Sequence, residues 1–337
     1  MRTTSSSTSS SRGGWLGFAA TWLAAALAGA ALLLAVAAAV DPYDTGRFAL
    51  VAKPGVRPQG PRTANASRGR DPAFDAAIIG NSHVQMLSPE RLSADTGHRF
   101  VQLATPGTKP REQIALISWF LRHHRGKARA LVVGVDPFWC TPDTSLTPDR
   151  PFPFWLYDAS AFAYLKGLLR LDTLEELPRR LADLTHPDPP RARADGFWDY
   201  EEEFLARGFR GGPAHDARLR AELKGDVPAN PNKRFPAFEA LARALPPQGE
   251  GPRLVLVHPP VFAPALPREG APEAAVEAAC KAEARRFARE RGGAVVDGRV
   301  DGPRTRDPES FFDQAHYRRP LAREVEAAIA GALAGLR

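Results

Sequence analysis

A single long apolar segment near the N-terminus constrains this chain more than any other feature. Residues 15–40 contain no charged side chain. As an α-helix they would extend roughly 39 Å at about 1.5 Å per residue, more than the ~30 Å hydrocarbon core of a bilayer. The charges that flank the segment are basic before it and acidic after it: Arg2, Arg12, Asp41 and Asp44. Because basic residues favour the cytoplasmic side, we expect residues 1–14 to be a cytoplasmic tail.

Two interpretations of this segment compete. The small residues of "AVAAAV" (residues 35–40) would suit the cleavage site of a signal peptide. The apolar run, however, is much longer than the roughly 7–15 residues of a signal-peptide core. We therefore expect a retained signal anchor, which makes a single-pass inner-membrane protein with its body in the periplasm or outside the cell. In either interpretation the body is exported.

Beyond the anchor, the chain alternates between short apolar runs and helical patterns. Residues 41–72, rich in Pro, Gly and Arg from about residue 53, are expected to be a linker. Strands are predicted within five ranges: 74–80, 100–104, 130–136, 253–260 and 293–297. Helices are predicted at three places: 111–124, 273–291 and a C-terminal segment with its apolar stripe on Leu321, Val325, Ile329 and Leu333. Val, Ile and Leu-rich strands alternating with helices predict an α/β body, residues 73–337, with a parallel sheet covered on both faces.

A long insertion, about residues 141–248, separates the third and fourth strands. It is rich in Pro and aromatic residues, as in "PFPFWLYDASAFAYL" and "DGFWDYEEEFLARGF". One interpretation is a small helical cap whose aromatic side chains form its own core. The other is a platform on which sugar rings stack.

Composition excludes several classes of function. The net charge of +7 is spread along the chain, with no basic block interleaved with aromatics, so we expect no nucleic-acid partner. Phosphate-binding and dinucleotide-binding glycine motifs are absent from the sequence, and the two cysteines lie in no metal-binding pattern. We therefore expect no cofactor and no metal. Cys140 and Cys280 could pair outside the cytoplasm, but sequence does not fix the distance between them.

Three short motifs combine residues that carry chemistry. The first strand runs into Gly80-Asn81-Ser82-His83, Gly107 lies between the second strand and the next helix, and "FFDQAHY" places Asp313 and His316 before the last helix. A serine hydroxyl becomes nucleophilic when a histidine takes its proton and a carboxylate orients that histidine. Backbone N–H groups in glycine-rich turns can stabilise the oxyanion that follows. The structural alternatives are a helix N-cap for Ser82, a simple turn for Gly107, and capping of the last helix by the Asp-x-x-His pair.

The three motifs together resemble those of the SGNH (GDSL-like) hydrolase superfamily. The resemblance is carried by "IIGNSHV", "QLATPGTKPREQ" and "FFDQAHY", and is strongest to the membrane-anchored branch that accompanies alginate acetylation and D-alanylation. It implies a flavodoxin-like three-layer sandwich. It also implies that Ser82 is the nucleophile, His316 the general base and Asp313 its partner, with the backbone of Ser82 and Gly107 as oxyanion donors.

One position departs from the pattern of that superfamily. The third block is commonly Gly-x-Asn-Asp, whose Asn donates to the oxyanion, whereas this chain has Asp136 at the matching strand end. An ionised carboxylate cannot donate, and loss of one donor costs about 10²–10³ in rate. Asn81, where the common form has Asp, is an alternative donor. Asp136 then either holds a loop or binds a substrate hydroxyl.

Two further histidines could line the pocket. His83 directly follows the nucleophile, and we expect it to be a neighbour of the site rather than a second base. His258 ends the fourth strand, where a structural role competes with a place in the pocket.

Two functions follow from these observations. The first is a membrane-anchored serine esterase or O-acyltransferase that moves a small acyl group on an extracytoplasmic polysaccharide through an acyl-enzyme. The second is a catalytically eroded protein of the same fold that binds polysaccharide or a membrane-bound acyltransferase. Sequence leaves the choice between transfer and hydrolysis open.

Overall fold

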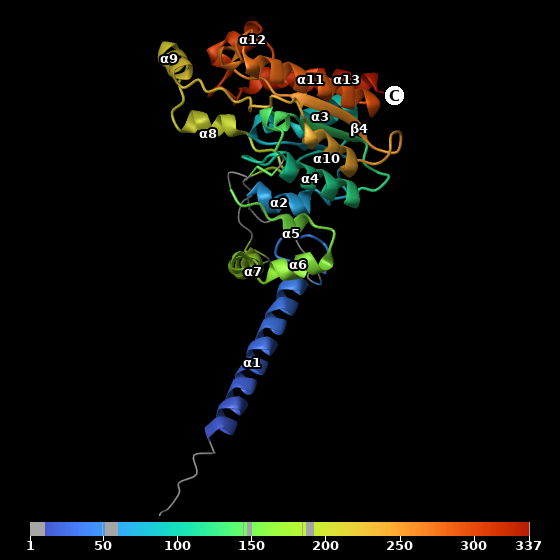
Figure 1. Cartoon of the computed structure of the whole chain (residues 1–337), viewed down its shortest axis with the longest axis vertical. Coiled ribbons are helices and arrows are strands. Elements are labelled where there is room, and N and C mark those ends of the chain that lie inside the picture. Colours follow the sequence, from blue (N-terminus) through green and yellow to red (C-terminus); the bar gives the residue numbers. More distant parts are fainter. Residues whose placement is uncertain are drawn as a thin grey trace, which may run out of the picture.

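The chain folds into an α/β body carried on one long N-terminal helix (Figure 1). The computed structural model describes residues 11–48, 50, 60–143, 145–146, 150–183, 185–186 and 192–336. The strands are β1 (Ala76–Ile79), β2 (Phe100–Gln102), β3 (Ala130–Gly134), β4 (Arg253–His258) and β5 (Ala294–Asp297). The helices before β4 are α1 (Ser11–Val40), α2 (Pro61–Arg68), α3 (Pro89–Thr96), α4 (Pro110–His123), α5 (Phe154–Tyr157), α6 (Ala161–Leu168), α7 (Leu171–Asp183), α8 (Tyr200–Ala206), α9 (Pro213–Ala221) and α10 (Pro236–Ala244). Those after it are α11 (Pro272–Glu290), α12 (Pro303–Arg306) and α13 (Arg319–Gly335), and four short 3₁₀ turns are η1 (Ser82–Val84), η2 (Pro137–Cys140), η3 (Ala263–Ala265) and η4 (Pro308–Ser310).

The five strands form one parallel sheet in the order β2-β1-β3-β4-β5. All five predicted strands and the parallel α/β class are confirmed. Alternate side chains of each strand enter two separate cores, so Ile79 packs beneath α4, α10 and α11, whereas Ile78 packs beneath α3 and α13. Burial on both faces explains why these strands are apolar at successive positions.

The helices that cover the sheet follow the predicted periodicity. Ile117 and Phe120 of α4 are fully buried in the first core. The stripe of α13 is buried at all four predicted positions, Leu321, Val325, Ile329 and Leu333. The predicted helices at 111–124 and 273–291 are confirmed within one residue as α4 and α11, and the predicted C-terminal helix is α13.

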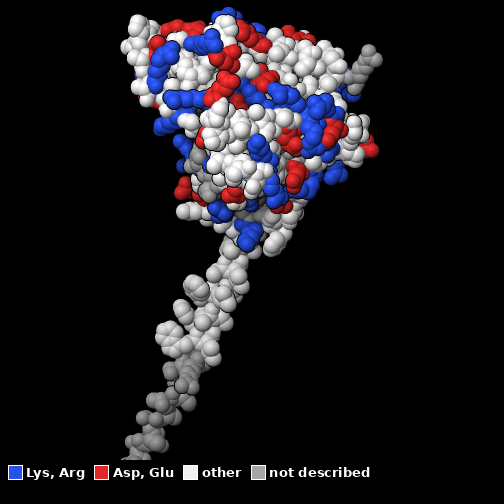
Figure 2. All heavy atoms as spheres, turned by 45° about the horizontal axis from the view of Figure 1, so that its top comes forward, with Lys and Arg blue, Asp and Glu red and all other residues white. Residues whose placement is uncertain are grey.

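Helix α1 is the one helix in the described part of the chain that is long and apolar enough to cross a membrane, over Gly14–Val40. Residues 14–40 of α1 contain no acidic or basic side chain, whereas both signs are interspersed over the body (Figure 2). A membrane span and a signal sequence share these properties. The last turn of α1, however, belongs to the body, because Ala37 and Val40 are buried and the helix contacts α6 and α7.

The segment that follows α1 differs from the expected linker. Residues 61–68 form α2, in which Ala64 and Ala66 are buried, and the indole N–H of Trp119 donates to the Ala66 carbonyl at 3.0 Å. The linker interpretation of residues 41–72 is therefore wrong for this part. Residues 49 and 51–59 lie outside the described residues, as do residues 1–10 of the expected tail.

The segment between β3 and β4 is helical and divides into three parts. Helix α10 packs against α4 and η2, α6 and α7 pack against the end of α1, and α9 contacts η4. The aromatic side chains serve mainly as packing, since Tyr164 is fully buried and Phe204 stacks on Phe312 with ring centroids 4.2 Å apart. A disulfide between Cys140 and Cys280, with Cα atoms 5.4 Å apart, ties η2 to α11.

Candidate active site

The polar motif after β1 is a tight turn that crosses the ends of two strands. Val84 of this turn lies against Gly80 at the end of β1 and Gly134 at the end of β3. A Cβ at Gly80 would come within 2.6 Å of Val84 Cγ2, and one at Gly134 within 2.7 Å of Val84 Cγ1. Both strands therefore end in glycine because a side chain at either position would push the turn, and with it Ser82, off the sheet edge.

Asn81 fixes this turn through both ends of its side-chain amide. It is the N-cap of η1, its Oδ1 accepts the backbone N–H of His83 at 3.0 Å, and its Nδ2 donates to Asp136 Oδ2. Only the second amide hydrogen remains for an oxyanion, so the role predicted for Asn81 depends on that hydrogen alone.

Asp136 holds the loop on the other side of this contact. Its side chain is 2% exposed, and its Oδ1 accepts the backbone N–H of Phe138 at 2.8 Å. Burial raises its pKa to about 7. Of the two roles that sequence left open for Asp136, these contacts favour holding the loop that carries Ser82.

His316 and Asp313 form a close pair in the loop before α13. His316 Nδ1 lies 2.8 Å from Asp313 Oδ2 and 2.9 Å from Oδ1, and the same Oδ1 accepts the backbone N–H groups of Ala315 and His316. Burial opposes ionisation of Asp313, but the hydrogen bond and charge of His316 outweigh it and lower the pKa to about 2. The ionised carboxylate therefore holds the hydrogen on Nδ1, which leaves Nε2 as the basic nitrogen.

The structure brings this pair to the Ser82 turn. The rings of His83 and His316 meet edge to face with centroids 5.6 Å apart. Within the described chain, the Ser82 hydroxyl makes no hydrogen bond with His316 or with any other group, and its side chain is partly exposed. Ser82 and His316 are therefore near each other but not hydrogen-bonded in this structure. Catalytic hydrogen bonds are often longer when no substrate is bound.

His83 packs against His316, and its environment favours the expected role of a neighbour over that of a second base. Burial and the adjacent His316 lower the pKa of His83 to about 3. At neutral pH it is an uncharged ring that packs against His316.

The backbone N–H groups of Ser82 and Gly107, both at this edge, have no hydrogen-bond partner among the described residues. Gly107 adopts φ +69°, in the left-handed region that favours glycine, just before the N-terminus of α4. The backbone N–H of Thr105 donates to the Gly80 carbonyl at 2.9 Å and ties this loop to the end of β1. These N–H groups suit the oxyanion role predicted for them.

The insertion contributes two side chains that sequence analysis did not identify. Glu201 of α8 is 4% exposed and accepts from the Arg318 guanidinium at 3.0 Å and from the Arg319 backbone N–H at 2.7 Å. The Tyr200 hydroxyl donates to the Tyr317 carbonyl at 2.9 Å, and its ring contacts that of His316 with centroids 5.6 Å apart. The only sequence signal was the acidic run "DYEEE", which by itself resembles an exposed helix start.

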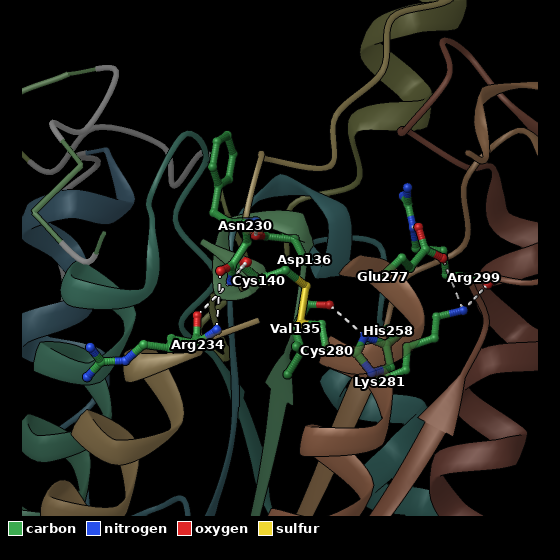
Figure 3. The surroundings of a disulfide bond; sticks show 11 residues. Val135, Asp136, Cys140, Asn230, Arg234, His258, Glu277, Cys280, Lys281 and Arg299 are labelled. Atoms are coloured by element: carbon green, nitrogen blue, oxygen red, sulfur yellow. Dashed lines mark hydrogen bonds and ion pairs between the residues drawn. A yellow bond between two sulfur atoms is a disulfide. The ribbon is translucent and has the colours of Figure 1, made fainter. Parts of the chain in front are cut away.

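His258 lies apart from this arrangement, in the surroundings of the disulfide (Figure 3). Its Nδ1–H donates to the Val135 carbonyl at 3.0 Å, and burial lowers its pKa to about 4. It makes no hydrogen bond with Ser82, Asp313 or His316 in the described chain. The contacts favour a structural role beneath the loop of Asp136.

Comparison with known proteins identifies no relative of this chain. No known family model and no curated protein matches the chain. In the part of the chain that the structure describes, no group of three or more His, Cys, Asp or Glu side chains is placed to hold a metal ion.

Proposed function

We propose that this protein is a membrane-anchored SGNH-type serine esterase or O-acyltransferase. The observation that carries the proposal is the Asp313–His316 pair, held against the turn of Ser82 at the carboxyl edge of a parallel sheet. Ligands bind at this edge in open α/β sheets. The residues come from opposite ends of the body, more than two hundred positions apart, and the competing helix-cap roles do not require them to meet.

The chemistry would proceed in two steps. Ser82 Oγ attacks the carbonyl carbon of an ester while His316 Nε2 takes its proton, and the N–H groups of Ser82 and Gly107 donate to the oxyanion. Collapse breaks the ester bond, and the departing alcohol takes the proton from His316. A sugar hydroxyl or water then attacks the acyl-serine while His316 Nε2 takes its proton, and as the acyl–serine bond breaks, Ser82 Oγ takes that proton back from His316. Asp313 orients the ring throughout.

The location follows from the anchor and the disulfide. The buried contacts of Ala37 and Val40 with the body favour retention of α1 over cleavage, since cleavage would expose the surface that they cover. A disulfide favours an oxidising compartment. We therefore place the body outside the cytoplasm, where the substrate would be an acyl ester, such as an acetyl ester, on a polysaccharide or glycan.

Active-site labelling of the full chain in detergent tests the proposal. A fluorophosphonate should label the wild-type protein and the Ser118→Ala control, whose serine lies on α4, but not Ser82→Ala. His316→Ala should slow labelling and the hydrolysis of 4-nitrophenyl acetate by at least about 10³-fold. If Ser82→Ala labels like the wild type, Ser82 is not the nucleophile. If none labels, the non-catalytic alternative, which binds polysaccharide or a membrane acyltransferase, is favoured.

A further inference from the structure

A cavity lies beside the Ser82 turn. It is a cavity of about 240 Å³ whose lining includes Arg68 of α2, Gln85, Trp198 and Glu203 of α8. Gln85 follows η1 directly, and Trp198 precedes Tyr200, whose ring contacts His316. The cavity therefore adjoins the candidate active site at the same edge of the sheet. Its volume is below the roughly 300–1,000 Å³ of pockets for drug-sized ligands, which suits a single sugar ring.

The unusual feature of this cavity is a buried arginine with no partner. Arg68 is 8% exposed, and its guanidinium makes no hydrogen bond or ion pair within the described chain. The carboxylate that acts on it electrostatically, Asp195, is already paired with Arg193. A buried charge is costly unless it is paired, so an unpaired arginine among the residues that line a cavity points to an anionic ligand.

The other lining groups add to this specificity. Trp198 offers an aromatic face, and Glu203 and Gln85 offer polar groups suited to hydroxyls. Gln102 is part of the wall rather than a binder, because its Nε2 donates to the carbonyls of Val84 and Leu87 at 3.2 and 3.0 Å. The combination of a cation, an aromatic face and hydroxyl partners matches an acidic sugar better than a simple ion.

We propose that this cavity binds an anionic sugar residue, with its carboxylate or phosphate on Arg68 and its ring against Trp198. This inference rests on the proposed function, because it takes the bound sugar to be part of the glycan that reacts at Ser82. It adds the chemical class of that glycan, an acidic one. Arginine suits the task because its planar fork binds carboxylate and phosphate in two-point fashion.

Binding measurements by calorimetry test the proposal on the full chain in detergent, in the Ser82→Ala background so that no turnover interferes. Glucuronic acid and glucose 6-phosphate are the two anionic probes, and glucose is the neutral one. At least one anionic probe should bind at least about 10-fold more tightly than glucose, and the stronger probe identifies the anion. Arg68→Met should weaken that binding by about 10–100-fold, the range for a charged hydrogen-bond partner. Arg289→Met is the matched control: it removes the same charge from an exposed position on α11 and should leave the affinity for the anionic probe unchanged.

A stability measurement separates ligand binding from a structural role. Because Arg68 has no hydrogen-bond or ion-pair partner, Arg68→Met should not lower the thermal midpoint of unfolding. If Arg68 had a structural role, the same substitution would lower that midpoint. Equal binding by Arg68→Met and Arg289→Met, or equal binding of glucose and both anions, overturns the proposal. Labelling of Ser82 tests the catalytic proposal separately. If labelling fails while Arg68-dependent binding persists, the site binds acidic sugar without the proposed chemistry.

Discussion

Removal of the disulfide should strongly destabilise the body. The bond joins residues 140 positions apart, enclosing the whole helical segment between β3 and β4. In the chain-entropy description, a loop of this length restricts the unfolded state by about 5 kcal/mol at 25 °C, and native disulfides typically contribute 2–5 kcal/mol. Both cysteines are buried, at 5% and 0% exposed, so replacement by alanine also leaves unfilled space in the core. We expect Cys140→Ala/Cys280→Ala to lose about 3–5 kcal/mol of unfolding free energy.

Urea denaturation in detergent, followed by tryptophan fluorescence, measures this loss. Trp139 is a suitable probe, because it is fully buried next to Cys140 and its indole N–H donates to the Gln113 side-chain oxygen at 2.8 Å. Dithiothreitol provides the matched control: it should lower the midpoint of the wild type toward that of the double variant and leave the variant unaffected. A loss below about 1 kcal/mol, or a variant that still responds to dithiothreitol, would refute the reasoning.

Three other substitutions probe the site. Asp136 has a pKa raised from 3.8 to about 7, so the folded chain retains a proton that the unfolded chain loses between about pH 4 and 7. Stability of the wild type relative to Asp136→Asn should therefore fall by up to about 4 kcal/mol as pH rises through that window, as measured by urea denaturation at each pH; a pH-independent difference contradicts this. Gly80→Ala should cost about 1–3 kcal/mol by overpacking against Val84, with recovery in Gly80→Ala/Val84→Ala, whereas Gly331→Ala in α13, with open space around its Cβ, should not destabilise. Glu201→Ala should leave Arg318 without its buried partner, costing about 2–4 kcal/mol and slowing fluorophosphonate labelling; unchanged labelling would deny Glu201 a positioning role.

The strands could be predicted because a strand buried on both faces of a sheet needs apolar residues at successive positions. Each is a short apolar run, rich in Val, Ile or Leu in most cases and too short for a typical helix, which favours a buried strand. Helix α2 could not be predicted, since its Pro, Arg and Asn residues resemble a linker. It is stabilised by distant contacts, such as the donation from Asn65 Nδ2 to the Leu103 carbonyl at 2.8 Å, that no local pattern encodes.

The candidate site could be predicted only where its residues stand in short local motifs. Ser82, Asp313 and His316 stand in short local motifs that mark strand and helix ends. The contact of Asn81 with Asp136 joins the ends of two strands, and the cavity of Arg68 is assembled from three separate segments. Burial and pairing of this kind depend on the tertiary structure, so no local pattern indicates the raised pKa of Asp136 or the unpaired charge of Arg68.

The junction between α1 and the body limits how far the body can move relative to the helix. Asp41, directly after α1, is fully buried and accepts from the Tyr164 hydroxyl at 2.8 Å, and Tyr43 is buried beside it. Figure 1 shows the helix leaving the body at its α6–α7 end, opposite α12. A body mounted on such a stiff stalk cannot sweep through a wide volume as one on a floppy tether would. Under the proposed function, the body would act at a fixed height above the bilayer, and a polymer would have to pass close to the membrane to be modified.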